Sequence, residues 1–158
     1  VPRRSSPIRI FYGFPFRDEL EVLSVLFSEL YEVVDQFIIL ETPNTFSGSP
    51  KPFYLDAEVG RYLSYMEKVH RVKVHVQTRC AATLASCIED VRNGIVYSAT
   101  HLLEPHGRLK GPDVLILADA DEVLSRQVVQ QVKHCEFRGP LRFGLRQYVY
   151  TLAWEIPP

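Results

Sequence analysis

Hydrophobic and polar positions in the first part of the chain repeat in two different ways. Residues 8–14 form an apolar run rich in β-branched and aromatic side chains, closed by Gly13 and Pro15, which predicts a strand. Residues 18–31 place apolar side chains three and four positions apart, which predicts a helix. Residues 33–41 form a second buried run that ends on an acid. Strand, helix and strand with short links predict a βαβ unit and therefore a parallel sheet.

The same two patterns continue through the rest of the chain and predict a three-layered α/β fold. The run at 113–118 is apolar enough for a strand in the middle of a mostly parallel sheet, covered on both faces. Ser125 is the expected N-cap of the helix that follows, and the architecture we expect is Rossmann-like. Before this strand we expect a short helix at residues 56–67, a half-exposed strand at 69–76 and a long helix at 83–103. After it we expect a helix at 125–135 and an extended aromatic segment at 141–150.

A loop interrupts the regular pattern at residues 42–54, where proline, glycine, serine and asparagine accumulate. No helix or strand tolerates three prolines and a glycine at these intervals. Loops of this length inside compact domains are more often functional than idle. At 158 residues the chain has the size of one domain, which we place at residues 8–158 after a polar lead-in at residues 1–7.

Composition and charge exclude several classes of protein. Hydrophobic residues make up 46% of the chain and charged residues 23%, which is ordinary for a globular domain. The formal net charge is -1 and the basic residues are scattered, so we expect no nucleic-acid partner. No apolar run approaches the ~20 residues needed to cross a bilayer, so we expect no membrane segment in this chain. Three cysteines without a CxxC pair favour small buried thiols over a zinc or redox site.

Three acidic residues stand directly after the apolar run at 113–118. Asp119, Asp121 and Glu122 lie where a strand of a parallel sheet ends, and ligands of such sheets bind beyond the carboxyl ends of the strands. Neighbouring carboxylates repel one another unless a positive charge lies between them. Asp119 and Asp121 project to the same side of an extended chain, and magnesium and manganese prefer oxygen ligands of this kind. The pattern predicts a divalent-cation site with Asp119, Asp121 and Glu122 as ligands.

Other interpretations of this acidic cluster stay open. Glu122 is a candidate for a further metal ligand or for orienting a catalytic base, but it is equally an acid at the start of the next helix. Asp119 to Val123 also fits the nucleophile motif of haloacid-dehalogenase-like phosphatases, in which the first Asp attacks phosphorus. That fold needs a lysine and more acids well downstream, and the acids that follow here are Glu136 and Glu155.

Several stretches between residue 8 and about residue 154 together resemble one enzyme family. They are Phe14-Pro15-Phe16, Glu19-Leu20 before Leu23, Val33-Val34-Asp35-Gln36-Phe37 with Glu41, Thr45, Ser47-Gly48 and Pro50-Lys51-Pro52 in the loop, Glu89 with Arg92-Asn93, and Asp119-Ala120-Asp121-Glu122. On these motifs the chain resembles the β-1,4-mannosyl-glycoprotein 4-β-N-acetylglucosaminyltransferases of glycosyltransferase family 17. That family includes the enzyme that adds the bisecting N-acetylglucosamine to N-glycans.

The resemblance implies a GT-A fold, UDP-N-acetylglucosamine (UDP-GlcNAc) as the donor, Mn²⁺ or Mg²⁺ as cofactor, and inversion at the sugar carbon. The acceptor it implies is a mannose of an N-glycan, or a similar glycan or glycoprotein. For an animal-like parent with an N-terminal anchor, it implies the Golgi lumen. The family continues beyond the position of Trp154 to Pro158, so we expect a fragment without the acceptor part and the catalytic base. A truncated module that binds the nucleotide sugar without turnover is the alternative.

Several residues are candidates for binding the donor. Lys51 would bring a mobile ammonium from the loop to the diphosphate, or else it is a solvated lysine. Arg92 would contact a phosphate, or else it pairs with Glu89 on the same helix face. Glu41 ends the second strand, where a base or ribose would lie, unless it only begins the loop. Asp119 would reach the ribose or a metal-bound water. The donor-binding candidates are thus Glu41, Thr45, Lys51, Arg92 and Asp119.

Overall fold

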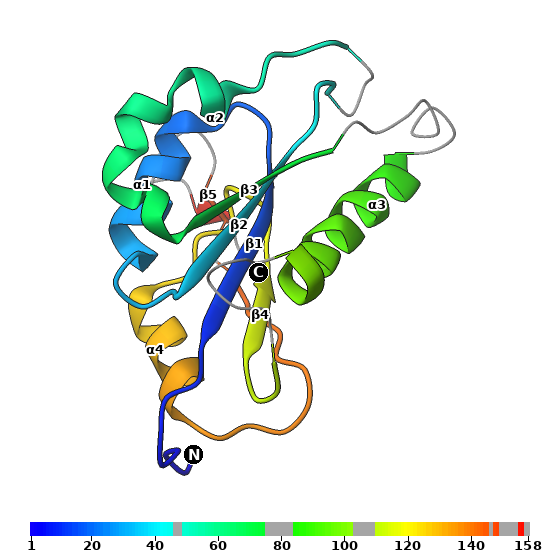
Figure 1. Cartoon of the computed structure of the whole chain (residues 1–158). Coiled ribbons are helices and arrows are strands. Elements are labelled where there is room, and N and C mark those ends of the chain that lie inside the picture. The colour runs from blue at the N-terminus through cyan, green and yellow to red at the C-terminus, as the bar shows by residue number, and fades with distance from the viewer. Residues whose placement is uncertain (46–48, 75–83, 103–109, 146, 149–154, 157–158) are drawn as a thin grey trace.

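The computed structural model describes residues 1–45, 49–74, 84–102, 110–145, 147–148 and 155–156. Its centre is a four-stranded sheet in the order β3-β2-β1-β4, in which every pairing is parallel (Figure 1). The predicted parallel central sheet is therefore confirmed. Its strands are β1 (Ile10–Phe16), β2 (Gln36–Glu41), β3 (Val69–Lys73) and β4 (Val114–Leu117).

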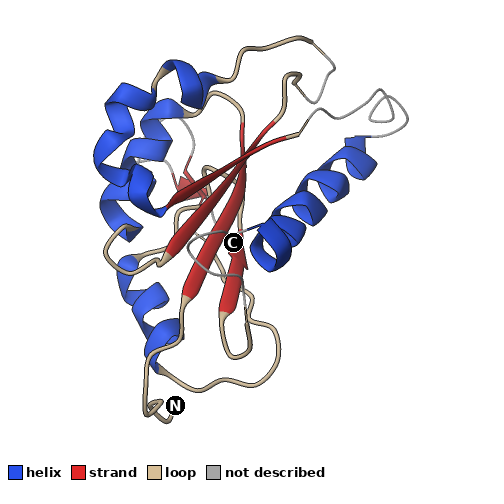
Figure 2. Ribbon diagram, viewed as in Figure 1, coloured by secondary structure: helices blue, strands red, loops and turns tan. Residues whose placement is uncertain are grey.

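Helices cover both faces of this sheet and make the three layers that the sequence predicts (Figure 2). One face carries α1 (Leu20–Leu30), α2 (Tyr54–Ala57), the 3₁₀ helix η1 (Val59–Lys68) and α4 (Arg126–His134). The other face carries α3 (Leu84–Tyr97), which continues into a π-helical turn at Ser98–Leu102. The α/β, Rossmann-like prediction is confirmed.

The alternation of side chains along β1 divides the core into two parts, as it must when both faces of a strand are covered. Tyr12 and Phe14 are fully buried in the larger part of the core, between the sheet and the layer of helices that includes α1 and α4. Phe11 points to the opposite face, where it packs with Val91 and Ile95 of α3. The apolar runs of β1 and β2 are continuous because these two strands are buried along almost their whole length. The prediction that residues 113–118 lie in the middle of the sheet, covered on both faces, is wrong. Among the described strands β4 pairs with β1 alone, at the edge of the sheet, and Leu117 is therefore 44% exposed.

Helix α3 approaches the sheet most closely at Gly13 of β1. A Cβ atom at this position would lie 2.2 Å from Cγ2 of Ile95, so only a residue without a side chain fits there. Gly94 makes a similar approach from the helix, since its Cβ would lie 2.9 Å from Cδ1 of Leu40. These contacts set the position of α3, and with it the position of Arg92, over the carboxyl ends of β1 and β2.

Two predicted boundaries differ from the structure. The strand predicted over residues 8–14 begins at Ile10 and continues to Phe16. It includes Pro15, which pairs with β2 alone because the β4 pairing ends at Gly13. Proline is tolerated at such a one-sided position. The helix predicted over 56–67 is a single α-helical turn, α2, followed by the 3₁₀ helix η1. Helix α4 begins as predicted, with the Ser125 hydroxyl accepting a hydrogen bond from the Val128 N–H.

The two ends of the chain add short contacts to this core. Two backbone hydrogen bonds connect the lead-in to the end of α4 and the residues after it, from Arg4 N–H to the His134 carbonyl at 2.8 Å and from Glu136 N–H to the Pro2 carbonyl at 2.8 Å. Residues 141–145 form no strand, and within the predicted segment 141–150 the strand is the short β5 (Gln147–Tyr148), paired with β6 (Glu155–Ile156). Cys135 is a half-buried free thiol, whereas Cys80 and the side chain of Cys87 lie outside the described residues.

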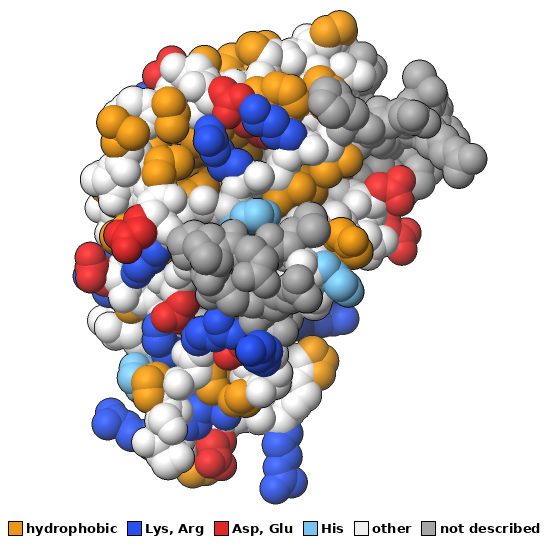
Figure 3. Space-filling model, in the orientation of Figure 1, with side chains coloured by type: hydrophobic (Ala, Val, Ile, Leu, Met, Phe, Trp, Pro, Cys, Tyr) orange, Lys and Arg blue, Asp and Glu red, His pale blue; other side chains and the backbone are white. Residues whose placement is uncertain are grey.

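The surface carries charge of both signs. On the face drawn in Figure 3, acidic and basic side chains lie intermingled among hydrophobic ones. This mixture agrees with the formal net charge of -1. Within the described part of the chain, no helix combines the length and the apolar character that a bilayer crossing requires.

Candidate functional site

The order of the strands reverses between β1 and β4, and a cleft lies at the carboxyl ends of these strands. β2 and β3 follow on one side of β1, whereas β4 lies on its other side. Ligands of open parallel sheets bind at such a reversal. The cleft has a volume of about 330 Å³, at the lower end of the range for small-molecule sites. It is lined by five of the predicted site residues, Thr45, Lys51, Arg92, Asp119 and Asp121.

The acidic residues after β4 form a tight turn instead of an extended chain. Glu122 N–H donates to the Asp119 carbonyl at 3.0 Å, and the Glu122 carboxylate accepts the Asp119 N–H at 2.8 Å. The backbone carbonyl of Glu122 in turn accepts the hydroxyl of Tyr12 at 2.7 Å. Asp119 and Asp121 line the cleft, and Glu122 does not. The third predicted ligand is thus turned into the loop by its own hydrogen bond.

Arg92 of α3 faces the acidic turn across the cleft. Its guanidinium Nη2 lies 3.6 Å from Oδ1 of Asp119, and both side chains are about half exposed. An exposed pair at this distance contributes little stability, so it can rearrange when a ligand enters. Among the described residues the ion pair of Arg92 is thus with Asp119, and not with Glu89 as the structural alternative predicted.

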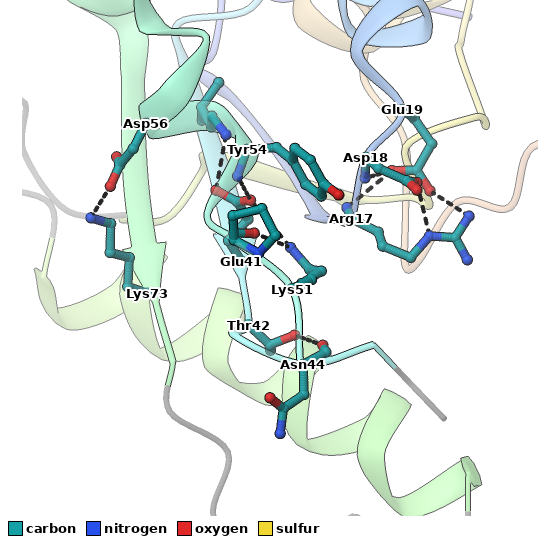
Figure 4. Close-up of polar contacts among 12 residues, drawn as sticks. Arg17, Asp18, Glu19, Glu41, Thr42, Asn44, Lys51, Tyr54, Asp56 and Lys73 are labelled. Carbon is teal, nitrogen blue, oxygen red and sulfur yellow. Dashed lines mark hydrogen bonds and ion pairs between the residues drawn. The ribbon is translucent and has the colours of Figure 1, made fainter. Parts of the chain in front are cut away.

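Glu41 holds Lys51 in place by an ion pair (Figure 4). The two side chains are each only 5% exposed, with Nζ of Lys51 at 3.3 Å from Oε1 of Glu41. The same carboxylate accepts the backbone N–H groups of Tyr54 at 2.7 Å and Leu55 at 3.4 Å, at the start of α2. Lys51 is therefore an anchored ammonium, not the mobile one expected. Glu41 does not line the cleft, and its carboxylate serves the loop and α2.

The loop after β2 is more ordered than its prolines suggest. Asn44 and Pro50 form an antiparallel bridge, and Lys51 N–H donates to the Pro43 carbonyl at 2.7 Å. The Thr45 hydroxyl accepts the Ser49 N–H at 3.1 Å. These contacts fold the described part of the loop back on itself and bring Thr45 and Lys51 to the same wall of the cleft.

Arg17 lines the cleft but is absent from the sequence-based candidates. It follows β1 directly, and its guanidinium Nε donates to Oδ1 of Asp18 at 2.9 Å (Figure 4). The hydrogen bond that Arg17 donates to Asp18 raises the pKa of Arg17, which therefore stays charged. A signal for it existed, since a charged residue directly after a central strand lies at the ligand edge of a parallel sheet.

The chemistry of the cleft suits a divalent cation and a phosphorylated ligand. Asp119 is 48% exposed on its side chain and Asp121 is exposed, so both carboxylates are accessible. Among the described residues no three acidic, histidine or cysteine side chains gather closely enough to hold a metal by themselves. Two carboxylates are nevertheless sufficient for Mg²⁺, which commonly binds one or two protein carboxylates and completes its coordination shell with water and substrate phosphates. Arg17, Lys51 and Arg92 supply positive charge on the same cleft.

Comparisons of the sequence with known proteins point to one family. The sequence model of glycosyltransferase family 17 matches residues 2–158. The β-1,4-mannosyl-glycoprotein 4-β-N-acetylglucosaminyltransferases of Rattus norvegicus and Homo sapiens are each 25% identical to the chain over 182 residues, which cover 99% of it. The chain spans only 29% and 30% of the length of these two relatives. No solved structure matches the chain significantly. Because the family match extends over nearly the whole sequence, the chain belongs to glycosyltransferase family 17.

Proposed function

We propose that this chain is the donor-binding part of an inverting glycosyltransferase that transfers N-acetylglucosamine from UDP-GlcNAc, with Mn²⁺ or Mg²⁺, to a mannose of an N-glycan or a similar glycan. The observation that carries the proposal is the meeting of Asp119 and Asp121 with Lys51 and Arg92 on one cleft at the strand reversal. The accessible carboxylates would hold a divalent cation, and the cationic side chains would hold a diphosphate. A neutral ligand would need neither kind of group.

Four side chains of the cleft have distinct tasks in this proposal. Asp121 would be the principal metal ligand, and Asp119 would reach the ribose or a water bound to the metal. Arg92 leaves Asp119 for a phosphate oxygen, where a guanidinium binds through two donors. Lys51 provides a fixed positive charge, since Glu41 holds its ammonium in place. A bound cation supplies the charge that offsets the negative charge developing on the departing diphosphate.

The proposal assigns acceptor binding and the catalytic base to none of the described residues. The chain spans about three tenths of its curated relatives, and the acceptor site and the catalytic base belong to the proposal only for the whole protein. We likewise propose the Golgi lumen as the compartment for an animal-like parent. Membership of family 17 argues against the phosphatase interpretation of Asp119 to Val123. A module that binds the nucleotide sugar without turnover is the second candidate, because the Glu122 carboxylate accepts the Asp119 N–H and Glu122 does not line the cleft.

Titration calorimetry of UDP-GlcNAc tests the donor site. We expect saturable binding in the presence of Mn²⁺, loss of this binding with chelator, and loss in Asp121→Asn. The matched control is Glu21→Gln, an acid whose side chain is 84% exposed on α1 outside the cleft, and it should bind as the parent does. Absence of binding by a folded chain, or equal binding by Asp121→Asn, would refute the proposal. Adding a mannose-terminated glycan and measuring UDP release then separates an enzyme from a binding module.

A further inference from the structure

The turn that carries Asp119 and Asp121 is fastened by groups that take no part in the proposed donor contacts. Two hydrogen bonds join its ends, from Glu122 N–H to the Asp119 carbonyl and from Asp119 N–H to the Glu122 carboxylate. The first bond is the ordinary closure of a four-residue turn. The second uses the side chain of Glu122, which closes the turn a second time and fixes the direction of the Asp119 backbone.

The turn is also tied to the central strand. Tyr12 of β1 is fully buried, and its hydroxyl donates to the Glu122 carbonyl at 2.7 Å. The ring is held by edge contacts with Phe14 and tilted contacts with Phe37, at centroid distances of 6.1 and 6.3 Å. Burial raises the pKa of the Tyr12 hydroxyl far above its ordinary value, so it stays protonated and remains a donor at any working pH.

We infer that Glu122 and Tyr12 are positioning residues, which hold the two cleft-lining aspartates in place without binding metal or donor themselves. This inference rests on the proposed metal-dependent function. Glu122 is the shared partner, because its backbone accepts from β1 while its carboxylate accepts from the turn after β4. The aspartates thereby take their positions from both strands at the reversal. A ligand set of only two carboxylates has little redundancy, so its affinity depends on this support.

Substitutions at Glu122 distinguish a positioning role from a ligand role. Glu122→Gln removes the charge but keeps a side-chain carbonyl that accepts the Asp119 N–H, whereas Glu122→Ala removes the acceptor. A positioning residue is rescued by glutamine, and a metal ligand is not. Tyr12→Phe tests the other bond, because it removes the hydroxyl and preserves the packed ring.

The experiment titrates Mn²⁺ in the presence of UDP and follows the signal of free Mn²⁺ by electron paramagnetic resonance. We expect Glu122→Gln to keep most of the affinity, and Glu122→Ala and Tyr12→Phe to lose about tenfold each, the scale of losing an outer-shell partner. Asp121→Asn should abolish the binding. Loss in Glu122→Gln as deep as in Asp121→Asn would make Glu122 a ligand and overturn the inference. Unchanged affinity in both Glu122→Ala and Tyr12→Phe would overturn it as well.

Amide hydrogen exchange provides a second measurement that requires no metal. The Asp119 N–H should exchange slowly in the parent and in Glu122→Gln, and distinctly faster in Glu122→Ala. Equal exchange in all three chains would remove the structural basis of the inference even if metal binding were intact. Conversely, the expected exchange pattern without any Mn²⁺ binding by the parent would refute the proposed function, and the positioning of a metal site with it. The two failures are therefore distinguishable.

Discussion

Replacing Lys51 by methionine should destabilise the protein strongly, although the residue lies in a proline-rich loop. Methionine keeps the length of the apolar stem and removes only the ammonium. The change leaves the Glu41 carboxylate, 5% exposed, without its counter-charge. A surface lysine of a solvated loop would tolerate the same change, so the variant tests whether the loop is anchored as the structure shows.

The magnitude follows from the contacts of the carboxylate. Removing one partner of a buried ion pair costs about 3–5 kcal/mol. Glu41 retains two backbone donors, the N–H groups of Tyr54 at 2.7 Å and Leu55 at 3.4 Å. We therefore take the lower end and expect a loss of about 3 kcal/mol in the free energy of unfolding. For a chain of this size that corresponds to a fall of roughly 6–12 °C in the melting temperature.

Urea unfolding followed by far-ultraviolet circular dichroism measures the effect. Glu41→Gln combined with Lys51→Met should recover part of the loss, because no buried charge then lacks a partner. Lys110→Met is the control, since Lys110 is exposed and its replacement should change stability by less than about 0.5 kcal/mol. A loss at Lys51 no larger than at Lys110, or strict additivity of the two changes in the double variant, would refute the buried pair.

Two further predictions concern packing and pH. Gly13→Ala should lower the free energy of unfolding in urea by about 1–3 kcal/mol, because its Cβ would lie 2.2 Å from Ile95. Gly60→Ala is the control and should be nearly neutral, since a Cβ there would have no atom within 4 Å. Equal effects of the two changes would contradict the close approach of α3. The hydrogen bond from Lys73 lowers the pKa of Asp56 below its ordinary 3.8, so the pair stabilises the fold above that pH and is lost as pH falls through the lowered value. Asp56→Asn should accordingly be less stable than the parent at pH 7, by under about 1 kcal/mol because the carboxylate is 37% exposed. This difference in unfolding free energy should disappear in acid. A difference that persists or grows in acid would contradict the lowered pKa of Asp56.

The architecture was accessible from the sequence because it depends on patterns that each segment carries alone. The apolar runs of β2 and β4 predict a parallel sheet between two helical layers, although β4 is an edge strand in which Leu117 is partly exposed. The position of Asp119 and Asp121 directly after such a run then predicts a ligand site, since the carboxyl ends of parallel strands share one edge. Where the pattern was weak, as in the 3₁₀ helix η1 and residues 141–145, the prediction failed or shifted.

The tertiary structure decided which polar atoms each candidate side chain meets. Glu41 turns to Lys51 and α2, Arg92 turns to Asp119, and Glu122 turns into its own loop and toward Tyr12. The contacts of Arg92 with Asp119 and of Glu122 with Tyr12 join segments far apart in the chain, so they depend on strand register and on how close α3 lies to Gly13. Residue type and spacing name the groups that can bind a metal or a phosphate. Which of them remain available for that task depends on the neighbours that folding brings. The carboxylates of Glu41 and Glu122 accept hydrogen bonds inside the protein and do not line the cleft, whereas Asp119 and Asp121 do.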